Sequence, residues 1–430
     1  MNSKNTSTQQ LAIDGGVPTR SQPLPLEFPG VYRIDEQEVE AAARVLRSRS
    51  LFRYYGIDPQ MEAESFETEF SAFIGTNHAL AVSSGTGALY TALSALGVGP
   101  GDEVIVPAYL WVSVIAAVVN LGAVPVLADI DDTFCLDPAS VEQKITPRTR
   151  GIVLVHMSGA PGDAEAVAQV VRTHGLFLLE DCAQCAGGSI AGRKVGTFGD
   201  MAIFSFQMNK NMTAGEGGCV VTNNRGLYRK AFACHDLGYA RDEQGRLVFD
   251  DADLTLWGRG CRMDEIRAAV LRVQLKKLGA TTAAMNHSKY RIRAALGRFE
   301  GVQLRRILDP AGDTGCFLLT TYRDGETARR VNVALKAEGI RTFPQGLSNV
   351  LMTDWGLHLY YNNVSLVQRR GLSWKIADNA GLERDYGKGA CPVADSLFER
   401  SIVLPIPSCL TENDEDEIIQ AFDKVLEALL

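Results

Sequence analysis

The stretch Gly175-Leu176-Phe177-Leu178-Leu179-Glu180-Asp181 is an apolar run that ends in two carboxylates. It is one of seven short apolar runs between residues 75 and 225, namely 78–82, 103–106, 124–128, 151–155, 176–179, 201–206 and 219–222. Segments long enough for helices separate most of them. Strands of this nearly continuous apolar kind, joined by helical crossovers, form a mostly parallel sheet covered on both faces. We therefore expect an α/β fold built on a mostly parallel seven-stranded sheet.

The rest of the chain predicts a second, smaller body. At 430 residues the chain is too long for one ordinary core. From about residue 285 two further β/α segments lead into a loop-rich region at 360–388. Thr411 is a candidate N-cap for a terminal helix whose apolar face holds Ile418, Phe422, Val425 and Leu429. We predict an N-terminal arm at 1–30, a large domain at 31–284 and a small C-terminal α/β domain at 285–430.

Charge and composition favour a small-molecule partner. Lys plus Arg total 43 against 51 Asp plus Glu, and the net charge of −8 disfavours a protein that binds nucleic-acid backbones. The polar start Met1–Gln10 lacks the apolar core of a signal peptide, and no stretch approaches the roughly 20 apolar residues of a membrane span. We expect a cytoplasmic protein without a nucleic-acid or membrane partner.

The nine cysteines are odd in number and scattered, most of them inside apolar runs. This distribution is typical of reduced, buried thiols rather than of a disulfide framework. Cys182 and Cys185 form a C-x-x-C pair, which leaves metal or thiol redox chemistry as an alternative. No second pair of ligands lies at zinc-binding spacing, so we predict no metal.

The turn Ala81-Val82-Ser83-Ser84-Gly85-Thr86-Gly87-Ala88-Leu89 places small residues between a predicted strand and a predicted helix. The start of such a helix presents free N–H groups and a hydroxyl, which together can hold an anion. Many strand-to-helix turns look the same and bind nothing. The turn is therefore a candidate phosphate site that needs support from other segments.

Asp181 follows a buried strand, at the edge where ligands of open α/β sheets collect. It could cap a helix or pair with Arg193. Alternatively, an ionised carboxylate here could keep a pyridinium nitrogen protonated, which lets the ring accept electrons.

Lys210 lies in Phe204-Ser205-Phe206-Gln207-Met208-Asn209-Lys210-Asn211, directly before the glycine-rich segment 213–218. Most lysines are solvated surface charges. This one is bracketed by an apolar strand, a polar turn and a glycine loop that leads to another apolar strand. Such a setting favours a desolvated, nucleophilic amine that can form a Schiff base.

Together these segments resemble the DegT/StrS type of fold-type I sugar aminotransferases. The motifs are Ser-Gly-Thr at 84–86, Asp-x-Ala-Gln at 181–184, Ser205 with Lys210, and Thr-x-Gly-Glu-Gly-Gly at 213–218. The similarity covers nearly the whole chain, with further matches at 11–16, 101–107, 391–394 and 404–405. It implies a homodimeric, pyridoxal-phosphate-dependent enzyme. Glutamate or glutamine would be the amino donor, and a keto-sugar, keto-sugar acid or keto-cyclitol the acceptor.

The resemblance also implies roles for individual residues. Lys210 would bind the cofactor as a Schiff base and move the proton, and Asp181 would pair with the pyridine nitrogen. The other cofactor-binding residues would be Gln184 near the ring hydroxyl, Trp111 stacked on the ring, and Gly85, Thr86 and Ser205 around the phosphate. Trp111 could instead be a plain core or interface aromatic. His156 matches a family position near the active site, without an assigned role.

The sequence departs from the family pattern in several places. Gly260 stands where the family has an Asn that reaches the partner subunit's phosphate, and Arg259 or another donor could replace it. Around 234–238 the family's histidine before the glycine is displaced, and His235 is the candidate counterpart. The region 360–388 matches no family segment, although we expect it to contribute to the substrate pocket.

Other sequence features leave the acceptor and the reaction open. The segment 51–56 resembles members that act on eight-carbon keto-sugar acids or keto-cyclitols, but it could equally be an exposed loop at a dimer interface. Related dehydratases carry His in place of the Schiff-base lysine, and Lys210 counts against that branch. Dehydrating synthases of an aminohydroxybenzoate keep the lysine and stay an alternative. A regulatory protein that merely retains the fold is disfavoured by the intact set Lys210, Asp181, Ser205 and Thr86.

Overall fold

A seven-stranded sheet forms the centre of the computed structural model, which describes residues 10–242, 244–254, 256–342 and 346–430. Its strand order is β1-β9-β8-β5-β4-β2-β3. The strands are β1 His78–Val82, β2 Glu103–Pro107, β3 Val124–Ala128, β4 Thr149–Val155, β5 Phe177–Asp181, β8 Met201–Ser205 and β9 Gly218–Thr222. Both pairings of β9 are antiparallel, and the others are parallel. The expected α/β fold with a mostly parallel seven-stranded sheet is confirmed.

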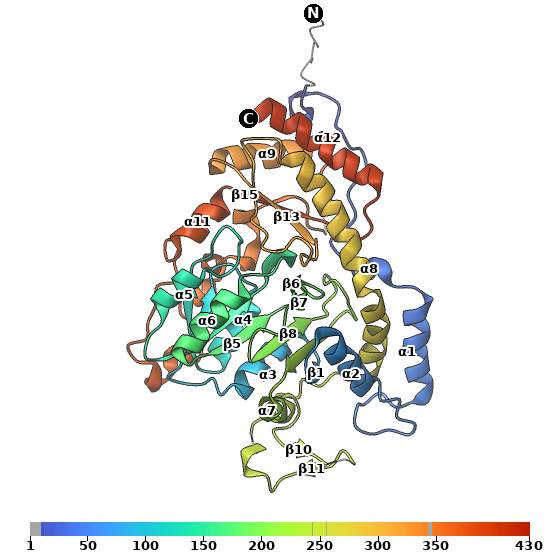
Figure 1. Ribbon diagram of the computed structural model, residues 1–430, viewed down its shortest axis with the longest axis vertical. Helices are drawn as coiled ribbons and strands as arrows, with labels where there is room; N and C mark the ends of the chain where they lie inside the picture. Colours follow the sequence, from blue (N-terminus) through green and yellow to red (C-terminus); the bar gives the residue numbers. More distant parts are fainter. Residues whose placement is uncertain (1–9, 243, 255, 343–345) are drawn as a thin grey trace, which may run out of the picture.

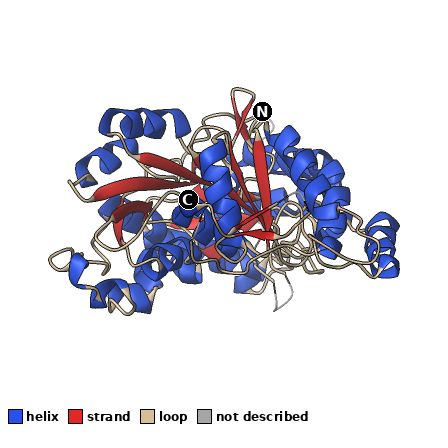
Figure 2. Ribbon diagram, turned by 90° about the horizontal axis from the view of Figure 1, so that it is seen from below, coloured by secondary structure: helices blue, strands red, loops and turns tan. Residues whose placement is uncertain are grey.

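Helices cover both faces of this sheet (Figure 2). The helices between its strands are α3 Gly85–Ala95, α4 Ser113–Asn120, α5 Pro138–Lys144 and α6 Ala164–His174. Helix α7 Arg225–His235 follows its last strand, β9. Residues of β2, β3, β5, β8 and β9 are buried throughout. This is why those strands are apolar on both of their faces rather than alternating.

A long helix joins the two ends of the molecule. Helix α8, Glu265–Leu296, packs against α1 Glu36–Ser48 and α2 Glu62–Ile74 along its first part and against α12 Glu412–Leu429 further on (Figure 1). It runs without interruption across the predicted domain boundary at 284/285. That boundary and the arm at 1–30 stay predictions.

A second, smaller sheet lies beyond α8. Its order is β12-β13-β15-β14, with bounds Gln303–Leu304, Phe317–Thr321, Ser401–Pro405 and Val350–Leu351, and its pairings are antiparallel. Helix α9 Gly325–Ala337 contacts strands β14 and β15 of this sheet and packs against α12. The terminal helix begins as predicted, because Thr411 and Asp414 form a capping box, and Ile418, Phe422 and Val425 are buried.

The remaining elements are short. They include the hairpin β6 Ser189–Ile190 and β7 Arg193–Lys194, the hairpin β10 Ala240–Arg241 and β11 Leu247–Val248, and helices α10 Val364–Val367 and α11 Pro392–Glu399. Single 3₁₀ turns lie at Ala12–Asp14, Val31–Arg33, Met157–Gly159, Ala252–Leu254, Met352–Asp354, Gly356–His358, Tyr360–Asn362, Ser373–Lys375 and Ala377–Asn379. The hairpin β10–β11 projects from the end of the molecule opposite α12 (Figure 1).

The region 360–388 covers the edge of the large sheet. The Ser373 hydroxyl donates to the carbonyls of Val119 and Ala123 at 2.9 and 2.7 Å. The Tyr386 hydroxyl donates to the carbonyl of Pro125, in edge strand β3, at 2.8 Å. Tyr386 thus covers a backbone carbonyl of the edge strand, and Ser373 holds the region against α4 and the turn before β3.

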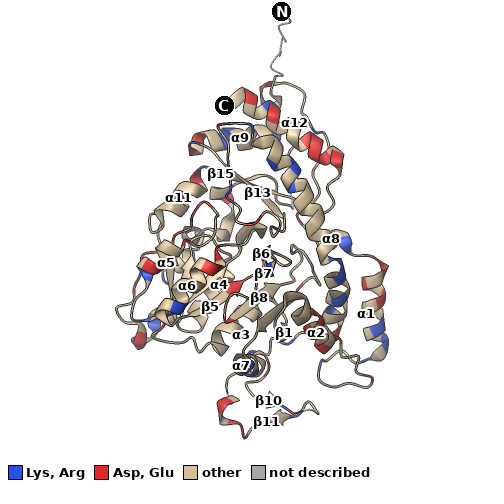
Figure 3. Cartoon of the chain, in the orientation of Figure 1, with Lys and Arg blue, Asp and Glu red and all other residues tan. Residues whose placement is uncertain are grey.

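Charged side chains are spread along outer helices such as α1 and α12 (Figure 3). Among the residues that the structure describes, no helix has both the length and the apolar character needed to cross a membrane.

Candidate active site

A cavity of about 670 Å³ opens at the carboxyl ends of the central parallel strands. Val155 of β4, Asp181 of β5 and Ser205 of β8 line it. Open α/β sheets bind their ligands at this edge. The walls contain all seven residues predicted from the sequence: Gly85, Thr86, Trp111, Asp181, Gln184, Ser205 and Lys210.

The start of α3 forms one wall of the cavity. Ser84 caps the helix, and its hydroxyl accepts from the N–H of Gly87 at 2.9 Å. The N–H groups of Gly85 and Thr86 belong to the first turn and have no intrahelical acceptor. A Cβ on Gly85 would lie 2.6 Å from Cβ of Ser205, so only glycine allows the helix to approach β8 this closely. The free N–H groups, the hydroxyls of Ser84 and Thr86 and the helix dipole make this wall suited to binding an anion.

Asp181 ends β5 and is almost completely buried. Its Oδ1 accepts from the N–H of Ala183 at 2.9 Å, and no partner of Oδ2 is described. Burial raises the pKa of this carboxyl, and the hydrogen bond and the nearby Lys210 oppose the rise. The alternative ion pair with Arg193 does not form, because that guanidinium donates to Thr197 and lies 3.8 Å from Glu165.

Lys210 lies in the turn after β8, and its main chain is held on both sides. Its N–H donates to the carbonyl of Gln207 at 3.0 Å, and its carbonyl accepts from the N–H of Gly30 at 3.1 Å. Enclosure by the protein lowers the pKa of the amine, and the charge of Asp181 opposes the shift. A lysine whose pKa is lowered is more often neutral and can act as a nucleophile.

Gln184 and Trp111 meet a histidine that the sequence did not indicate. Oε1 of Gln184 accepts from the N–H of Ser158 at 2.8 Å, and its Nε2 lies 3.5 Å from Nε2 of His358. The rings of Trp111 and His358 have centroids 4.8 Å apart. Trp111 is 44% exposed, which excludes the alternative of a core aromatic. His358 comes from a 3₁₀ turn far along the chain, and no motif or spacing in the sequence connects it to Gln184.

The cavity has further polar lining residues beyond those seven: Ser83, Ser84, Ser113, Gln207, Asn209, Glu216 and Arg267. Of these, Ser83 and Ser84 belong to the turn that the sequence indicated as a phosphate site. Arg267 lies in the first turn of α8, where its guanidinium pairs with Asp264 at 2.8 Å and donates to the carbonyl of Ser83 at 3.2 Å. Nothing in the local sequence indicates that the start of this helix meets the sheet edge.

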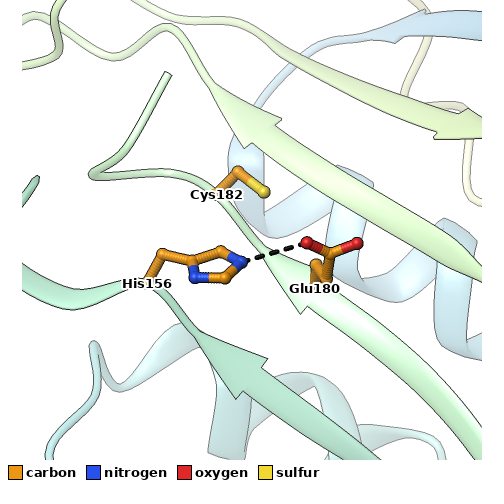
Figure 4. Close-up of side chains that lie close together, drawn as sticks. All are labelled: His156, Glu180 and Cys182. Carbon is orange, nitrogen blue, oxygen red and sulfur yellow. Dashed lines mark hydrogen bonds and ion pairs between the residues drawn. The ribbon is translucent and has the colours of Figure 1, made fainter. Parts of the chain in front are cut away.

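His156 lies outside the lining of this cavity, in a buried cluster with Glu180 and Cys182 (Figure 4). Its Nδ1 accepts from the N–H of Gly162 at 3.1 Å, so Nε2 carries the proton and donates to Glu180 at 3.1 Å. The same carboxylate accepts from the N–H groups of Gly196, Phe198 and Gly199. These hydrogen bonds tie β4 and β5 to the segment before β8, and they occupy the imidazole and the carboxylate that could otherwise bind a metal.

All nine cysteines are free thiols. Burial raises the pKa of the Cys182 and Cys185 thiols well above the ordinary value. Thiols in this state are poor nucleophiles and poor metal ligands.

The residues that depart from the family pattern lie outside the described lining. Gly260 is exposed with φ +64°, and the guanidinium of Arg259 lies 4.8 Å from the ring centroid of Tyr90. His235 is buried, and its Nε2 lies 3.1 Å from the Tyr54 hydroxyl.

The segment 51–56 has two parts. Arg53 is buried and donates to Glu67 and to the carbonyl of Ala81, whereas Tyr55 is mostly exposed. The region 360–388 contributes no residue to the described lining, which takes His358 from just before it.

Several known proteins are similar to this chain. A putative L-glutamine:3-amino-2,3-dideoxy-scyllo-inosose aminotransferase of Streptomyces kanamyceticus is 38% identical, and the alignment covers 98% of both chains. The protein of the same description from Streptoalloteichus tenebrarius is 40% identical over 63% of this chain, and the match spans 62% of that relative's length. The solved structure of 3-amino-5-hydroxybenzoic acid synthase is 30% identical, with a TM-score of 0.78, and the match covers 95% of this chain and 100% of that one.

These likenesses confirm the expected fold-type I aminotransferase architecture. The family model of the DegT/DnrJ/EryC1/StrS aminotransferases matches residues 32–346, which is well over half of the sequence. The chain therefore belongs to the DegT/DnrJ/EryC1/StrS aminotransferase family.

Proposed function

We propose that this protein is a pyridoxal-phosphate-dependent aminotransferase that moves an amino group from glutamine or glutamate to a keto-cyclitol or a related keto-sugar. The observation that carries the proposal is the meeting of the Lys210 amine, the Asp181 carboxylate and the start of α3 in one cavity. Similar proteins named as glutamine:scyllo-inosose aminotransferases support a cyclitol acceptor with glutamine as donor.

The residues present fit the cofactor. The first turn of α3, with Gly85 and Thr86, and the hydroxyl of Ser205 would hold the phosphate. The buried Asp181 has an oxygen without a described partner, which suits a protonated ring nitrogen. The half-exposed indole of Trp111 offers a flat face at the cavity wall. When bound, the cofactor supplies an electron sink for the carbon that exchanges its amino group.

Lys210 would bind the cofactor covalently through Nζ and, once released, would move the proton at the reacting carbon. Its lowered pKa keeps a larger share of the amine neutral, as both tasks require. Asp181 would keep the ring nitrogen protonated. Since burial disfavours its ionised form, that form depends on the cationic groups beside it.

The rest of the lining suits a polyhydroxylated acceptor and an amino acid donor. Apolar side chains of Leu89, Val155, Met157 and Ile203 would exclude water from the reacting atoms. The guanidinium of Arg267, which pairs with Asp264 and donates to the carbonyl of Ser83, would bind the donor's carboxylate through its remaining N–H groups. Asn209 and Glu216 would form hydrogen bonds with hydroxyl groups of the acceptor.

We also infer that two copies of the chain associate. Phe249, which directly follows β11, is 81% exposed, and Trp257 is 96% exposed. Trp257 follows Leu256, whose N–H donates to the carbonyl of Gly238 just before β10. Large apolar side chains that are this exposed favour an interface.

A screen of acceptors tests the function. The purified protein, supplied with pyridoxal phosphate, is offered glutamine or glutamate together with 2-deoxy-scyllo-inosose, its 3-amino analogue, keto-sugar acids or nucleotide-linked keto-hexoses. We expect one class of ketone to give the amine with an equal amount of 2-oxoglutaramate or 2-oxoglutarate, measured by mass spectrometry. A dehydrated aromatic product without any keto acid would instead establish a dehydrating synthase and overturn the proposal.

A further inference from the structure

The side-chain amide of Gln184 has one orientation that its neighbours allow. The N–H of Ser158 can only donate, so the atom 2.8 Å from it must be the amide oxygen Oε1. The amide nitrogen Nε2 therefore faces Nε2 of His358, at 3.5 Å.

His358 has one tautomer that fits its neighbours. Its Nδ1 lies 3.0 Å from the carbonyl of Trp355, and a carbonyl can only accept. Nδ1 therefore carries the proton, and Nε2 keeps a lone pair that accepts from Gln184.

The surroundings of His358 keep the ring neutral. The rings of Trp111 and Trp355 lie against it, with centroids 4.8 and 4.9 Å away, and Tyr109 is 6.4 Å away. Burial lowers the pKa of His358 to about 3, and Lys210, when its amine is protonated, acts in the same direction. The lone pair on Nε2 is thus retained at neutral pH.

Ser158, the other partner of Gln184, is held in an unusual conformation. Its φ of 55° lies in the left-handed region, which few residues other than glycine adopt. The Tyr109 hydroxyl lies 2.9 Å from its side-chain oxygen. Arg305 donates to its carbonyl at 3.4 Å and to that of Met157 at 2.9 Å.

Arg305 is a buried guanidinium whose described partners are oxygens of the main chain and a thiol, rather than a carboxylate. It lies directly after β12, whereas the turn that it holds follows β4. The two sheets are therefore joined at the point that orients Gln184.

We propose that His358 and the Ser158 turn are positioning residues for Gln184, and that Arg305 holds this turn in place. They orient the Gln184 amide so that its NH₂ group, and not its oxygen, is available to the molecule bound beside Lys210. One N–H of Gln184 is directed to His358, and the second has no described protein acceptor. This second N–H can donate to an oxygen of the bound molecule that has a free lone pair. The identity of the bound molecule rests on the proposed function, but the locked amide does not.

NMR of the protein without cofactor tests the lock directly. Protein labelled with ¹³C and ¹⁵N in histidine reports the tautomer of each ring, and His358→Phe identifies the His358 signals. Exposed His287 on α8, replaced by Gln, is the matched control. We expect the Nδ1–H tautomer and no titration of His358 between about pH 5 and 8. An Nε2–H tautomer, or a titration midpoint within that range, would overturn the proposal.

A second variant tests the contact between the two side chains. Gln184→Glu keeps an acceptor for the N–H of Ser158 but places a carboxylate, which cannot donate, opposite Nε2 of His358. We expect the His358 pKa to rise in this variant, with a proton appearing on Nε2, because an adjacent carboxylate favours the imidazolium form. His358 signals that match those of the wild type at every pH would show that the two side chains do not interact.

The loaded enzyme provides a third readout. His358→Phe keeps an aromatic ring against Trp111 but removes the acceptor, so the Gln184 amide is held only through the contact of its oxygen with the N–H of Ser158. We expect kcat to fall by about tenfold to a hundredfold with little change in KM for the amino donor, and the absorbance band of the bound cofactor to shift. Unchanged kcat and absorbance in a folded variant would contradict the positioning role. Failure of the proposed function itself would leave both NMR results intact.

Discussion

At the scale of single residues, the proposed function requires the amine of Lys210 for covalent binding of pyridoxal phosphate. We expect Lys210→Ala to lose the absorbance band of the protein-bound cofactor and to lower turnover by about 10²- to 10⁴-fold, because both attachment and proton transfer depend on Nζ. Exposed Lys230, replaced by Ala, is the control and should keep both properties. A Lys210→Ala protein that stays yellow after dialysis would refute the assignment.

Replacement of Asp181 should lower turnover without releasing the cofactor. In Asp181→Asn the amide oxygen can still accept from the N–H of Ala183, so the fold of the turn should persist. The ring nitrogen would no longer be held protonated, and we expect kcat to fall by about 10²-fold or more while the cofactor remains bound. Spectrophotometry gives the bound fraction and a coupled assay gives kcat. Turnover at the wild-type rate would show that Asp181 does not pair with the ring.

His235 makes the stability of the fold depend on pH. Burial lowers its pKa from the ordinary 6.5 to about 3, so between these values the unfolded chain binds a proton that the folded chain does not. The free energy of unfolding is therefore unaffected by this residue above 6.5 and falls by about 1.4 kcal/mol per unit below it, until pH 3 is reached.

Urea unfolding checks this dependence. Between about pH 7.5 and about pH 5 we expect the wild type to lose roughly 2 kcal/mol more than His235→Gln, which cannot take up the proton. Parallel losses in the two proteins would mean that His235 is not held neutral.

At the scale of elements, the start of α3 depends on the absence of a side chain at Gly85. In Gly85→Ala the new Cβ would lie 2.6 Å from Cβ of Ser205, so the helix would have to move away from β8. We expect the affinity for pyridoxal phosphate to fall by roughly tenfold, which corresponds to about 1.4 kcal/mol.

Gly279 in α8 is the matched control, because a Cβ there meets nothing within 4 Å. Gly279→Ala should leave the affinity unchanged and raise helix stability by up to about 1 kcal/mol. Fluorescence titration with the cofactor compares the two variants. Equal affinities would show that the close approach of α3 to β8 is not needed.

At the scale of the whole molecule, the exposed residues near the projecting hairpin favour a dimer. We expect sedimentation at twice the 46.7 kDa of one chain. Trp257→Ser combined with Phe249→Ser should weaken association by several kcal/mol, because each side chain would leave an apolar interface. Val17→Ser, which changes an equally exposed residue elsewhere, should have no effect. A fully active monomer would contradict the inferred association.

The large sheet and the pair Asp181 and Lys210 could be predicted from the sequence because their signals are local. Each buried strand appears as an apolar run, and a residue directly after such a run must lie at the ligand-binding edge of a parallel sheet. The terminal helix is similarly local, since Thr411 caps the helix that its own periodicity predicts.

His358, Arg267 and Arg305 could not be predicted, because their place depends on how distant segments dock. The turn containing His358 reaches the cavity while the following region 360–388, which we expected at the substrate pocket, covers the edge strand β3 instead. No local sequence pattern predicts which segment lies at the cavity and which covers β3. Both placements depend on the surfaces that remain to be buried once the sheets have formed. The sequence by itself determined the fold class, the family and the set of candidate residues that meet in the cavity. Only the tertiary structure decided what orients Gln184 and which side chains complete the cavity, because those contacts join residues whose separation along the chain carries no signal.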